Sequence, residues 1–265
     1  MRLSAYIGGI GILGPGFDNW PQAASVLAGR QPYQSAPTQL PNPVTLPAAE
    51  RRRTGRVVKL ALAIAHEAAA NAEADAAQIP SVFCSSGSDG HICHEICQAL
   101  ALSSREVSPT RFSNSVHNVA AGYWSISTGS MAEANVLCAF DASFVAGLLD
   151  ALAQTAVDQQ AVLLVAYDTE YPPPLHAKRP IPDAFGVAMV LTPDRGPTSL
   201  ARIDLVLTDE NADLLPDKGL EALRIAIPAA RSLPLLRLLA AGSSGYAVLD
   251  YLDVSRASVR VQPCS

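Results

Sequence analysis

The side chains of this sequence that could do chemistry gather between residues 108 and 151. Cys138, His117 and Asp141 supply a thiol, an imidazole and a carboxylate, which are the groups of a nucleophilic hydrolase or acyltransferase. Such a site needs the sulfur at an exposed corner and the imidazole within hydrogen-bond reach. Cys138 lies in an apolar run of strand length, and the alternation of side chains along a strand argues against its sulfur being exposed at a corner. We expect a buried structural thiol there, with the hydrolase as an alternative hypothesis.

The elements around these residues place a strand-to-helix corner at 139–143. A helix is predicted over 114–127, capped by its first two residues and ended by Gly129. An apolar run of strand length follows at 134–139, and apolar residues return to a helical period over 143–156. The corner reads Ala-Phe-Asp-Ala-Ser. Many α/β enzymes expose a nucleophile at such a corner, because the next helix offers unpaired N–H groups and a positive dipole end.

The same stretch resembles the β-ketoacyl synthases, the condensing enzymes of fatty-acid and polyketide synthesis. Their corner reads Ala-Cys-(Ser/Thr)-Ser/Gly and follows a helix with Asn…Ala-Gly-(His/Tyr). Matching 120–122 (Ala-Ala-Gly) and 128–129 (Thr-Gly) to that pattern puts Asp141 at the position of the acyl-accepting cysteine, with Ser143 matching the family serine. One gap would shift the position to Phe140. Neither register places a cysteine there.

The resemblance implies an α/β fold of the thiolase-like, condensing-enzyme type, with a shortened second half. It covers roughly residues 1–195, and 196–265 correspond to a truncated remnant of the second five-stranded unit, so we expect one domain over 1–265. The family decarboxylates its substrate with two histidines of the second half, but no histidine follows His176. With nucleophile and histidine pair both missing, we expect that the protein is not an enzyme.

Family members without the cysteine act as chain-length factors, and this chain resembles the short ones associated with bacterial aryl-polyene pigments. The resemblance implies a heterodimer with a catalytic ketosynthase, whose acyl tunnel the subunit shapes, and contact with an acyl carrier protein. The strand that would pair antiparallel with the partner consists of Asn135, Val136, Leu137, Cys138 and Ala139. The residues that would approach the tunnel are Phe112, Asn114, Val116, His117 and Phe140. A lone histidine such as His117 is more often a satisfied core residue.

A second alternative is a module that binds an acyl carrier protein without a ketosynthase partner. A basic cluster could meet such an acidic protein or a partner subunit, although a solvated helix face explains it equally well. Its residues are Arg51, Arg52, Arg53, Arg56 and Lys59.

The amino-acid composition argues against several other classes of protein. The chain has 265 residues, of which 49% are hydrophobic, so it can bury a substantial core. A net charge of -5 argues against nucleic acid. Five cysteines are an odd number in a chain too long to need disulfides, which indicates a reducing compartment. No apolar run reaches the ~18 residues of a membrane span. We expect a cytoplasmic protein.

Two further motifs are rejected. The glycines of 9–14 spell a dinucleotide fingerprint, but Pro15 follows where a helix should open, so they are interpreted as permitting a tight strand exit. One predicted helix carries His91, Cys93, His94 and Cys97 at spacings that could gather a metal. Closed zinc sites usually collect ligands from separate elements, so no metal is predicted, and no cofactor is indicated.

The rest of the pattern predicts alternating strands and helices. Strands are predicted over 3–12, 82–85, 161–167, 184–191, 200–207, 247–252 and 258–261. Helices are predicted after Asp18, over 50–76, up to 102, over 219–227 and over 233–241, with proline-rich connections at 31–48 and 168–182.

Overall fold

The computed structural model describes residues 2–264 and contains one eight-stranded sheet with the order β3-β2-β4-β5-β1-β6-β8-β7. Strands β2, β3 and β4 are parallel to one another, and the other neighbours are antiparallel. The strands are β1 (Leu3–Leu13), β2 (Ser81–Cys84), β3 (Ala134–Leu137), β4 (Val162–Asp168), β5 (Phe185–Thr192), β6 (Ala201–Thr208), β7 (Gly245–Leu252) and β8 (Ser255–Pro263). All the predicted strands are confirmed, with ends shifted by a few residues.

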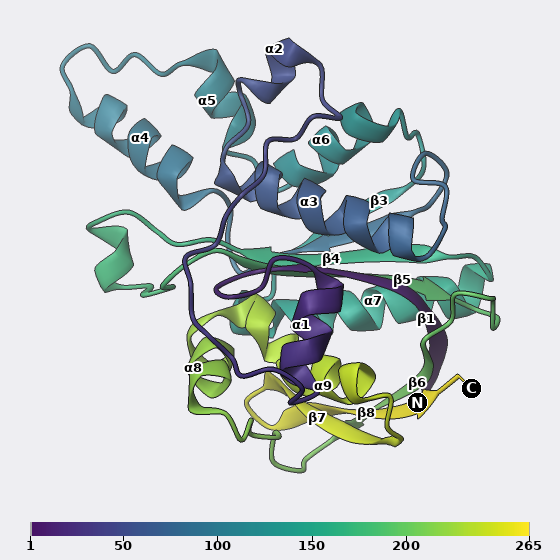
Figure 1. Cartoon of the computed structure of the whole chain (residues 1–265). Coiled ribbons are helices and arrows are strands. Elements are labelled where there is room, and N and C mark those ends of the chain that lie inside the picture. Colours follow the sequence, from purple (N-terminus) through teal and green to yellow (C-terminus); the bar gives the residue numbers. More distant parts are fainter. Residues whose placement is uncertain (1, 265) are drawn as a thin grey trace.

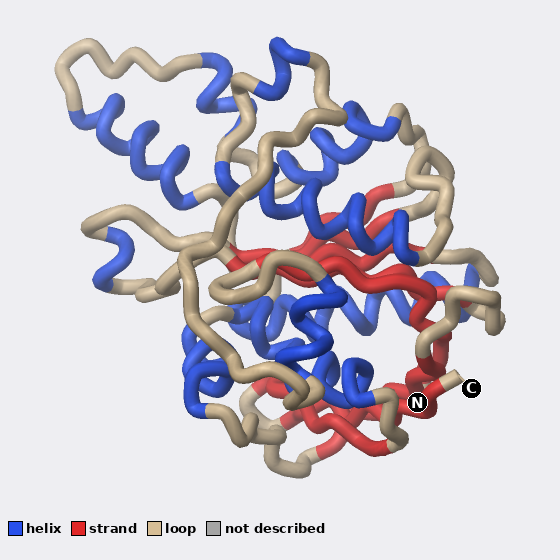
Figure 2. The backbone as a smooth tube through the Cα atoms, in the orientation of Figure 1, coloured by secondary structure: helices blue, strands red, loops and turns tan. Residues whose placement is uncertain are grey.

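The helices lie on both sides of this sheet, as Figure 2 shows. They are α1 (Trp20–Leu27), α2 (Ala48–Arg51), α3 (Arg56–Asn71), α4 (Gly90–Ala101), α5 (Pro109–Asn114), α6 (Val119–Thr128), α7 (Ser143–Asp158), α8 (Lys218–Ala226) and α9 (Leu233–Ala241). Three short 3-10 turns are η1 (Phe140–Ala142), η2 (Leu175–Ala177) and η3 (Pro228–Ser232). Helices α3 and α6 cover one face, and α7, α1 and α9 lie on the other (Figure 1).

Strand β1 joins two arms of the sheet. Its first residues, Leu3–Ile7, pair with β6, and its later residues, Tyr6–Leu13, pair with β5 across an irregularity between Ile7 and Gly9. The sheet bends at this strand, so that α7, α1 and α9 lie between the arms (Figure 1). Two core clusters result, one on each face of the upper arm.

The central strands β4 and β5 are buried on both faces. Leu164 and Val187 pack into the α7 side, whereas their neighbours Leu163 and Ala188 pack into the α3 side. Because successive side chains of a strand point to opposite faces, a strand covered twice is a continuous apolar run. This arrangement explains why both strands could be recognised in the sequence.

The glycines of β1 serve close packing against α3. A Cβ on Gly9 would lie 2.4 Å from the carbonyl oxygen of Ala68, and one on Gly11 would lie 2.1 Å from that of Ile64. Neither distance is tolerable for a real side chain. Gly9 and Gly11 therefore permit the close approach of α3, whereas the sequence predicted that they permit a tight strand exit.

Two predicted helices differ from those in the structure. The helix expected over 114–127 corresponds to α6 and begins only at Val119, because Asn114 ends a separate short helix, α5, where its buried side chain donates to the carbonyl oxygen of Arg53 (2.8 Å). The helix expected over 50–76 is α2 and α3, with Gly55 in extended conformation at the N-cap of α3. Gly129 ends α6 in the left-handed conformation (φ 71°), as predicted.

The helical stretch Phe140–Asp158 has 19 residues and is apolar enough to cross a membrane by length and composition. This corrects the expectation that no run reaches that length. Half of its apolar window is buried. It lies between the two arms of the sheet (Figure 1), where Phe144, Leu148 and Leu152 join the core cluster of that side. Its composition thus matches that of the core helix of a globular fold.

The two ends of the sheet differ. Strand β3 has β2 on one side, and no described strand pairs with its other edge. At the opposite end, the segment before α8 partly covers β7: Val248 N–H donates to the Asp213 carboxylate (2.9 Å), and Asp213 N–H donates to the Val248 carbonyl oxygen (2.8 Å). Such cover protects a strand edge from further pairing, and β3 lacks it.

A buried carboxylate closes the carboxyl end of the parallel strands. Asp168, the last residue of β4, accepts hydrogen bonds from the backbone N–H (2.9 Å) and hydroxyl of Ser86 and from the N–H of Ala229 (2.8 Å). Burial raises the pKa of Asp168 to about 6, although these donors and Arg179 lower it in part. The loop after β2, the end of β4 and η3 are thereby fixed together.

Substituting Gly11 by Ala should destabilise the protein by about 1–3 kcal/mol, because the new Cβ forces α3 away from β1. Gly8→Ala is the matched control on the same strand. Its Cβ would meet only ordinary contacts at 3.6 Å, and we expect no loss of stability. Urea unfolding of both variants checks this; equal destabilisation would show that helix-strand distance is not the constraint.

The free energy of unfolding should fall as pH rises from about 4 to about 6 through the titration of Asp168. The folded state binds this proton more tightly than the unfolded chain, whose pKa is near the ordinary 3.8, so the stabilisation is complete below 3.8 and lost above about 6. The contribution is about 3 kcal/mol. Urea unfolding at several pH values should show this slope in the wild type and in the exposed-site control Asp209→Asn, but not in Asp168→Asn. An unchanged slope in Asp168→Asn would contradict the assignment.

Candidate functional site

The strand-to-helix corner carries a residue in a strained backbone conformation. Phe140, the first residue of η1, has a φ of 52°, in the left-handed region that bulky side chains rarely adopt. The hydroxyl of Ser143 lies 2.7 Å from the carbonyl oxygen of Phe140 and 3.0 Å from that of Ser85, and it accepts the N–H of Ala139 (3.0 Å). Ser143 therefore ties the corner to the loop after β2.

The ring of Phe140 faces outward and is covered on one side by Arg179. The residue is 61% exposed, and the guanidinium carbon of Arg179 lies 3.9 Å from the ring centroid. A cation over an aromatic face is attracted to it by about 0.5–1 kcal/mol at exposed sites. Arg179 lies at the end of the proline-rich excursion between β4 and β5, so this contact joins two segments far apart in the sequence.

Asp141 is held by two arginines. One carboxylate oxygen accepts from Arg179, and the other lies 3.2 Å from a guanidinium nitrogen of Arg231, which also donates to the Asp141 carbonyl oxygen (3.0 Å). Arg231 comes from η3, in the C-terminal part of the chain. A carboxylate engaged in this way is a structural anion, and its oxygens are not free to attack a thioester.

The loop Ser85–Ser86 brings several of the sequence-predicted residues together. The His117 Nε2 atom lies 3.4 Å from the Ser85 hydroxyl, and the Cys138 thiol donates to the Ser86 carbonyl oxygen (3.4 Å). Burial lowers the pKa of His117. His117, Cys138, Ser143 and the corner thus surround one dipeptide at the carboxyl end of β2.

Cys138 is exposed, which contradicts the expectation of a buried thiol. Strand β3 ends at Leu137 and lies at the edge of the sheet, so alternation no longer governs Cys138 and no neighbouring strand covers it. All five cysteines are free. The thiol donates its proton to a carbonyl oxygen, His117 contacts Ser85, and Asp141 pairs with arginines. A hydrolase relay of these three residues is therefore not assembled in the described part of the chain.

The residues expected near an acyl tunnel differ in exposure. Phe112 is 66% exposed, and Val116 and Phe140 are also exposed. His117 is half-buried, and Asn114 is buried beneath them. Apart from the Arg53 carbonyl oxygen, Asn114 contacts the hydroxyl of Tyr123 (3.5 Å). Helix α5 thus presents Phe112 to solvent and uses Asn114 as its anchor.

The residues expected to pair with a partner lie on the free edge of the sheet. Asn135 is exposed and its amide donates to the Asp150 carboxylate (3.2 Å), whereas Val136, Leu137 and Ala139 are half-buried. The backbone of β3 pairs on one side with β2. Its other side offers unpaired backbone groups to another strand.

Neither the predicted basic cluster nor the histidine-cysteine helix forms a distinct site. Arg53 pairs with Glu50 (3.1 Å) and Arg56 with Glu170 (2.6 Å), so two of the five basic side chains are paired locally. His91 lies 3.7 Å from Glu170. Within residues 2–264, no group of three or more His, Cys, Asp or Glu side chains is arranged to hold a metal.

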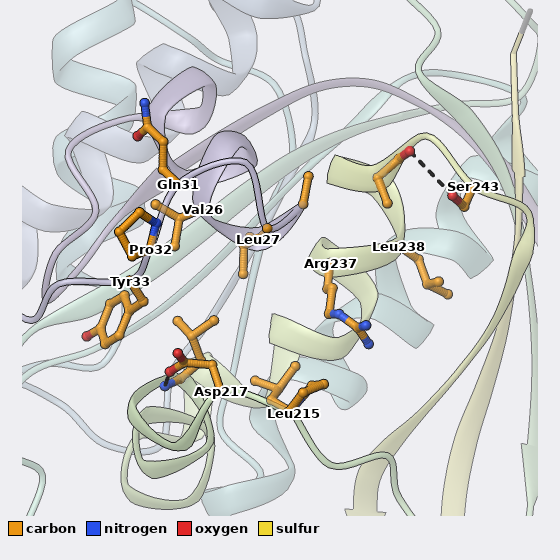
Figure 3. A pocket seen from close by; sticks show the side chains of 15 residues that line it. Val26, Leu27, Gln31, Pro32, Tyr33, Leu215, Asp217, Arg237, Leu238 and Ser243 are labelled. Carbon is orange, nitrogen blue, oxygen red and sulfur yellow. Dashed lines mark hydrogen bonds between the residues drawn. The ribbon is translucent and has the colours of Figure 1, made fainter.

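A separate recess of about 630 Å³ lies between α1, the turn that follows it, and helices α8 and α9 (Figure 3). Its walls are mostly apolar, with Leu27 and Leu215 among them, and Tyr33, Asp217 and Arg237 add polar groups. It contains none of the residues singled out in the sequence. The Asp217 carboxylate caps α8 by accepting the N–H groups of Gly219 and Leu220 (2.8 and 3.0 Å).

Sequence reasoning missed Arg179, Arg231, Ser86 and Asp168 as parts of the corner. Arg179 lies in the proline-rich connection at 168–182, which was predicted only as a connection between two strands. Arg231 gives no signal, since its position depends on how the C-terminal part packs.

Comparisons with known proteins identify the family and the fold. Residues 19–236 match the family model described as beta-ketoacyl synthase, N-terminal domain. A search of curated proteins gave no significant match.

Solved structures show the same fold over the whole chain. A complex of a ketosynthase (ApeO) with its chain length factor (ApeC) from Xenorhabdus doucetiae contains a chain that matches with a TM-score of 0.72 and 21% identity, covering 97% of this chain and 99% of that one. The ishigamide ketosynthase/chain length factor matches with a TM-score of 0.71 and 13% identity, covering 99% and 100%. A type II polyketide synthase acyl carrier protein in complex with its ketosynthase (AntDE:AntF) matches with a TM-score of 0.77 and 11% identity, covering 100% of both chains.

The expected thiolase-like fold in a shortened form is thereby confirmed. Because the family model spans most of the sequence, the chain belongs to the β-ketoacyl synthase family.

Proposed function

We propose that this protein is a non-catalytic chain-length factor, which pairs with a catalytic β-ketoacyl synthase and shapes the acyl tunnel of that partner. The observation that carries the proposal is the corner: the fold is that of the family, and at the strand-to-helix corner, where the resemblance puts the family nucleophile, this chain has Phe140 and Asp141, with Asp141 paired with two arginines. A subunit without a nucleophile affects the reaction only by shaping or stabilising the site of its partner.

The backbone favours Phe140 as the counterpart of the family cysteine. A nucleophile elbow holds its central residue in a strained conformation on a sharp turn from strand to helix. Phe140 is the residue with positive φ at this corner, whereas Asp141 pairs inward with the arginines. In this register the subunit keeps the elbow and replaces the reactive group by an exposed ring.

The proposed partner surface combines the free edge of β3 with the exposed side chains around the corner. An edge strand with unpaired backbone groups is a template for a strand of another subunit. Phe112, Val116 and Phe140 expose apolar side chains to solvent. The solved ketosynthase/chain length factor complexes support a heterodimer, and the complex with an acyl carrier protein supports transient contact with such a carrier. From the resemblance of the sequence to the short chain-length factors of aryl-polyene pigments, we propose aryl-polyene or related polyketide synthesis.

We propose that 1–265 is one domain, in which residues 196–265 are the shortened second half; strands from both parts share the same sheet. We also propose a cytoplasmic location, which the five free cysteines support. The alternative of a carrier-binding module without a ketosynthase has less support, because two of the five residues in the basic cluster are already paired within the chain.

Pairing through β3 should be sensitive to charge on that strand. Asn135→Lys should weaken the heterodimer at least about tenfold, because a lysine on the edge opposes the incoming strand. Tyr246→Lys, on the covered β7 at the other end of the sheet, is the control and should leave affinity unchanged. Co-expression with candidate full-length ketosynthases, followed by biophysical titration of the purified subunits, measures both. Equal affinities would place the interface elsewhere.

The size of the exposed side chains Phe140 and Phe112 should set the length of the acyl product. Phe140→Ala and Phe112→Ala should each give longer products from the complex, because an exposed ring is removed from the proposed tunnel wall. Phe144→Ala is the control, since Phe144 is buried in the core; it should cost about 3–5 kcal/mol of stability without changing the length of the product. Mass spectrometry of products, beside thermal melting of each heterodimer, tests this. Unchanged lengths in both exposed-site variants would exclude these rings from the tunnel wall.

A further inference from the structure

We infer that Arg179 and Arg231 are positioning residues that fix the direction of the Phe140 ring through an ion-pair lock on Asp141, and that the product length set by this subunit depends on that lock. The inference rests on the function proposed above. It assigns a role to Asp141, Arg179 and Arg231 beyond the pairing of the two subunits.

One guanidinium makes two contacts with adjacent residues. Arg179 pairs with the Asp141 carboxylate and at the same time lies over the ring of Phe140, 3.9 Å from its centroid. Arginine suits this double contact, because its planar group can stack on a ring while its N–H groups bind a carboxylate at the edge. The ring is therefore fixed relative to Asp141.

The backbone of the corner is restrained from the other side. Arg231 donates to the carbonyl oxygen of Asp141 and pairs with its carboxylate, and Ser143 lies within hydrogen-bond distance of the carbonyl oxygen of Phe140. Holding an aromatic residue in the left-handed backbone conformation costs of order 1–3 kcal/mol of folding free energy. Such a conformation persists only where several surrounding contacts fix it. These contacts supply that restraint at both carbonyl groups.

The burial of the two arginines makes their ion pairs effective. Their side chains are only 19% and 21% exposed, so solvent screens these pairs less than ordinary surface pairs. Removing either arginine would leave the Asp141 carboxylate with one ion-pair partner instead of two.

The segments that meet here lie far apart in the sequence. Phe140 and Asp141 form the corner, Arg179 ends the excursion between β4 and β5, and Arg231 belongs to η3. Both η3 and β7 pack against η1. The C-terminal part of the chain therefore contacts the corner through η3 and β7.

The test is the product distribution of the heterodimer with Arg179→Gln and Arg231→Gln. We expect each to broaden the distribution and move it toward the longer products of Phe140→Ala, and Arg179→Lys to move it less. Arg56→Gln is the matched control: Arg56 pairs with Glu170 and Asp183 of the same excursion (2.6 and 3.6 Å) but does not touch the corner. If Arg56→Gln changes the products as much as Arg179→Gln, the loop and not the ring is responsible, and the inference fails.

A second measurement observes the ring without relying on products. The full chain with 4-fluorophenylalanine at position 140 should give a fluorine resonance that shifts and narrows in Arg179→Gln but not in Arg56→Gln. An identical resonance in the wild type and Arg179→Gln would overturn the lock. If instead no candidate ketosynthase yields products with the wild-type chain, the proposed function fails, and the fluorine spectra still decide whether the lock exists.

Discussion

The double pairing of β1 is the constraint on which the rest of this structure depends. One strand pairs with β5 along its later residues and with β6 along its first, so the sheet bends there and encloses α7 between its arms. The bend also brings η3 beneath the corner that opens α7, where Arg231 reaches Asp141. The geometry of the site is therefore set by a strand that contributes no side chain to it.

Close packing fixes the positions of the helices relative to the strands. Helix α3 can approach β1 only because Gly9 and Gly11 lack a Cβ, and α7 approaches β2 in the same way through Gly147, whose Cβ would lie 2.5 Å from the sulfur of Cys84. Protein interiors are packed like molecular crystals, so such contacts leave little freedom. A strained residue such as Phe140 can persist at the end of elements held this firmly.

Local patterns predicted the elements well, and long-range contacts account for what they missed. Strands such as β4 and β5 are apolar runs buried on both faces, so composition alone identifies them. Asn114 shows the opposite case: its local signal is that of a helix cap, but a tertiary hydrogen bond to Arg53 uses the side chain differently. Cys138 was expected to be buried because the sequence does not reveal that β3 stops one residue earlier at an open edge. The corner itself was located correctly from its strand and helix periods, whereas its arginines were not, because they come from segments 38 and 90 residues away.

The unequal ends of the sheet limit how this protein can assemble. The edge of β7 is partly occupied by the backbone and carboxylate of Asp213, while that of β3 is open. A sheet open at both ends could add subunits repeatedly and grow into a fibre, whereas one with a single open end is saturated after one addition. The asymmetry therefore favours closed pairs over polymers.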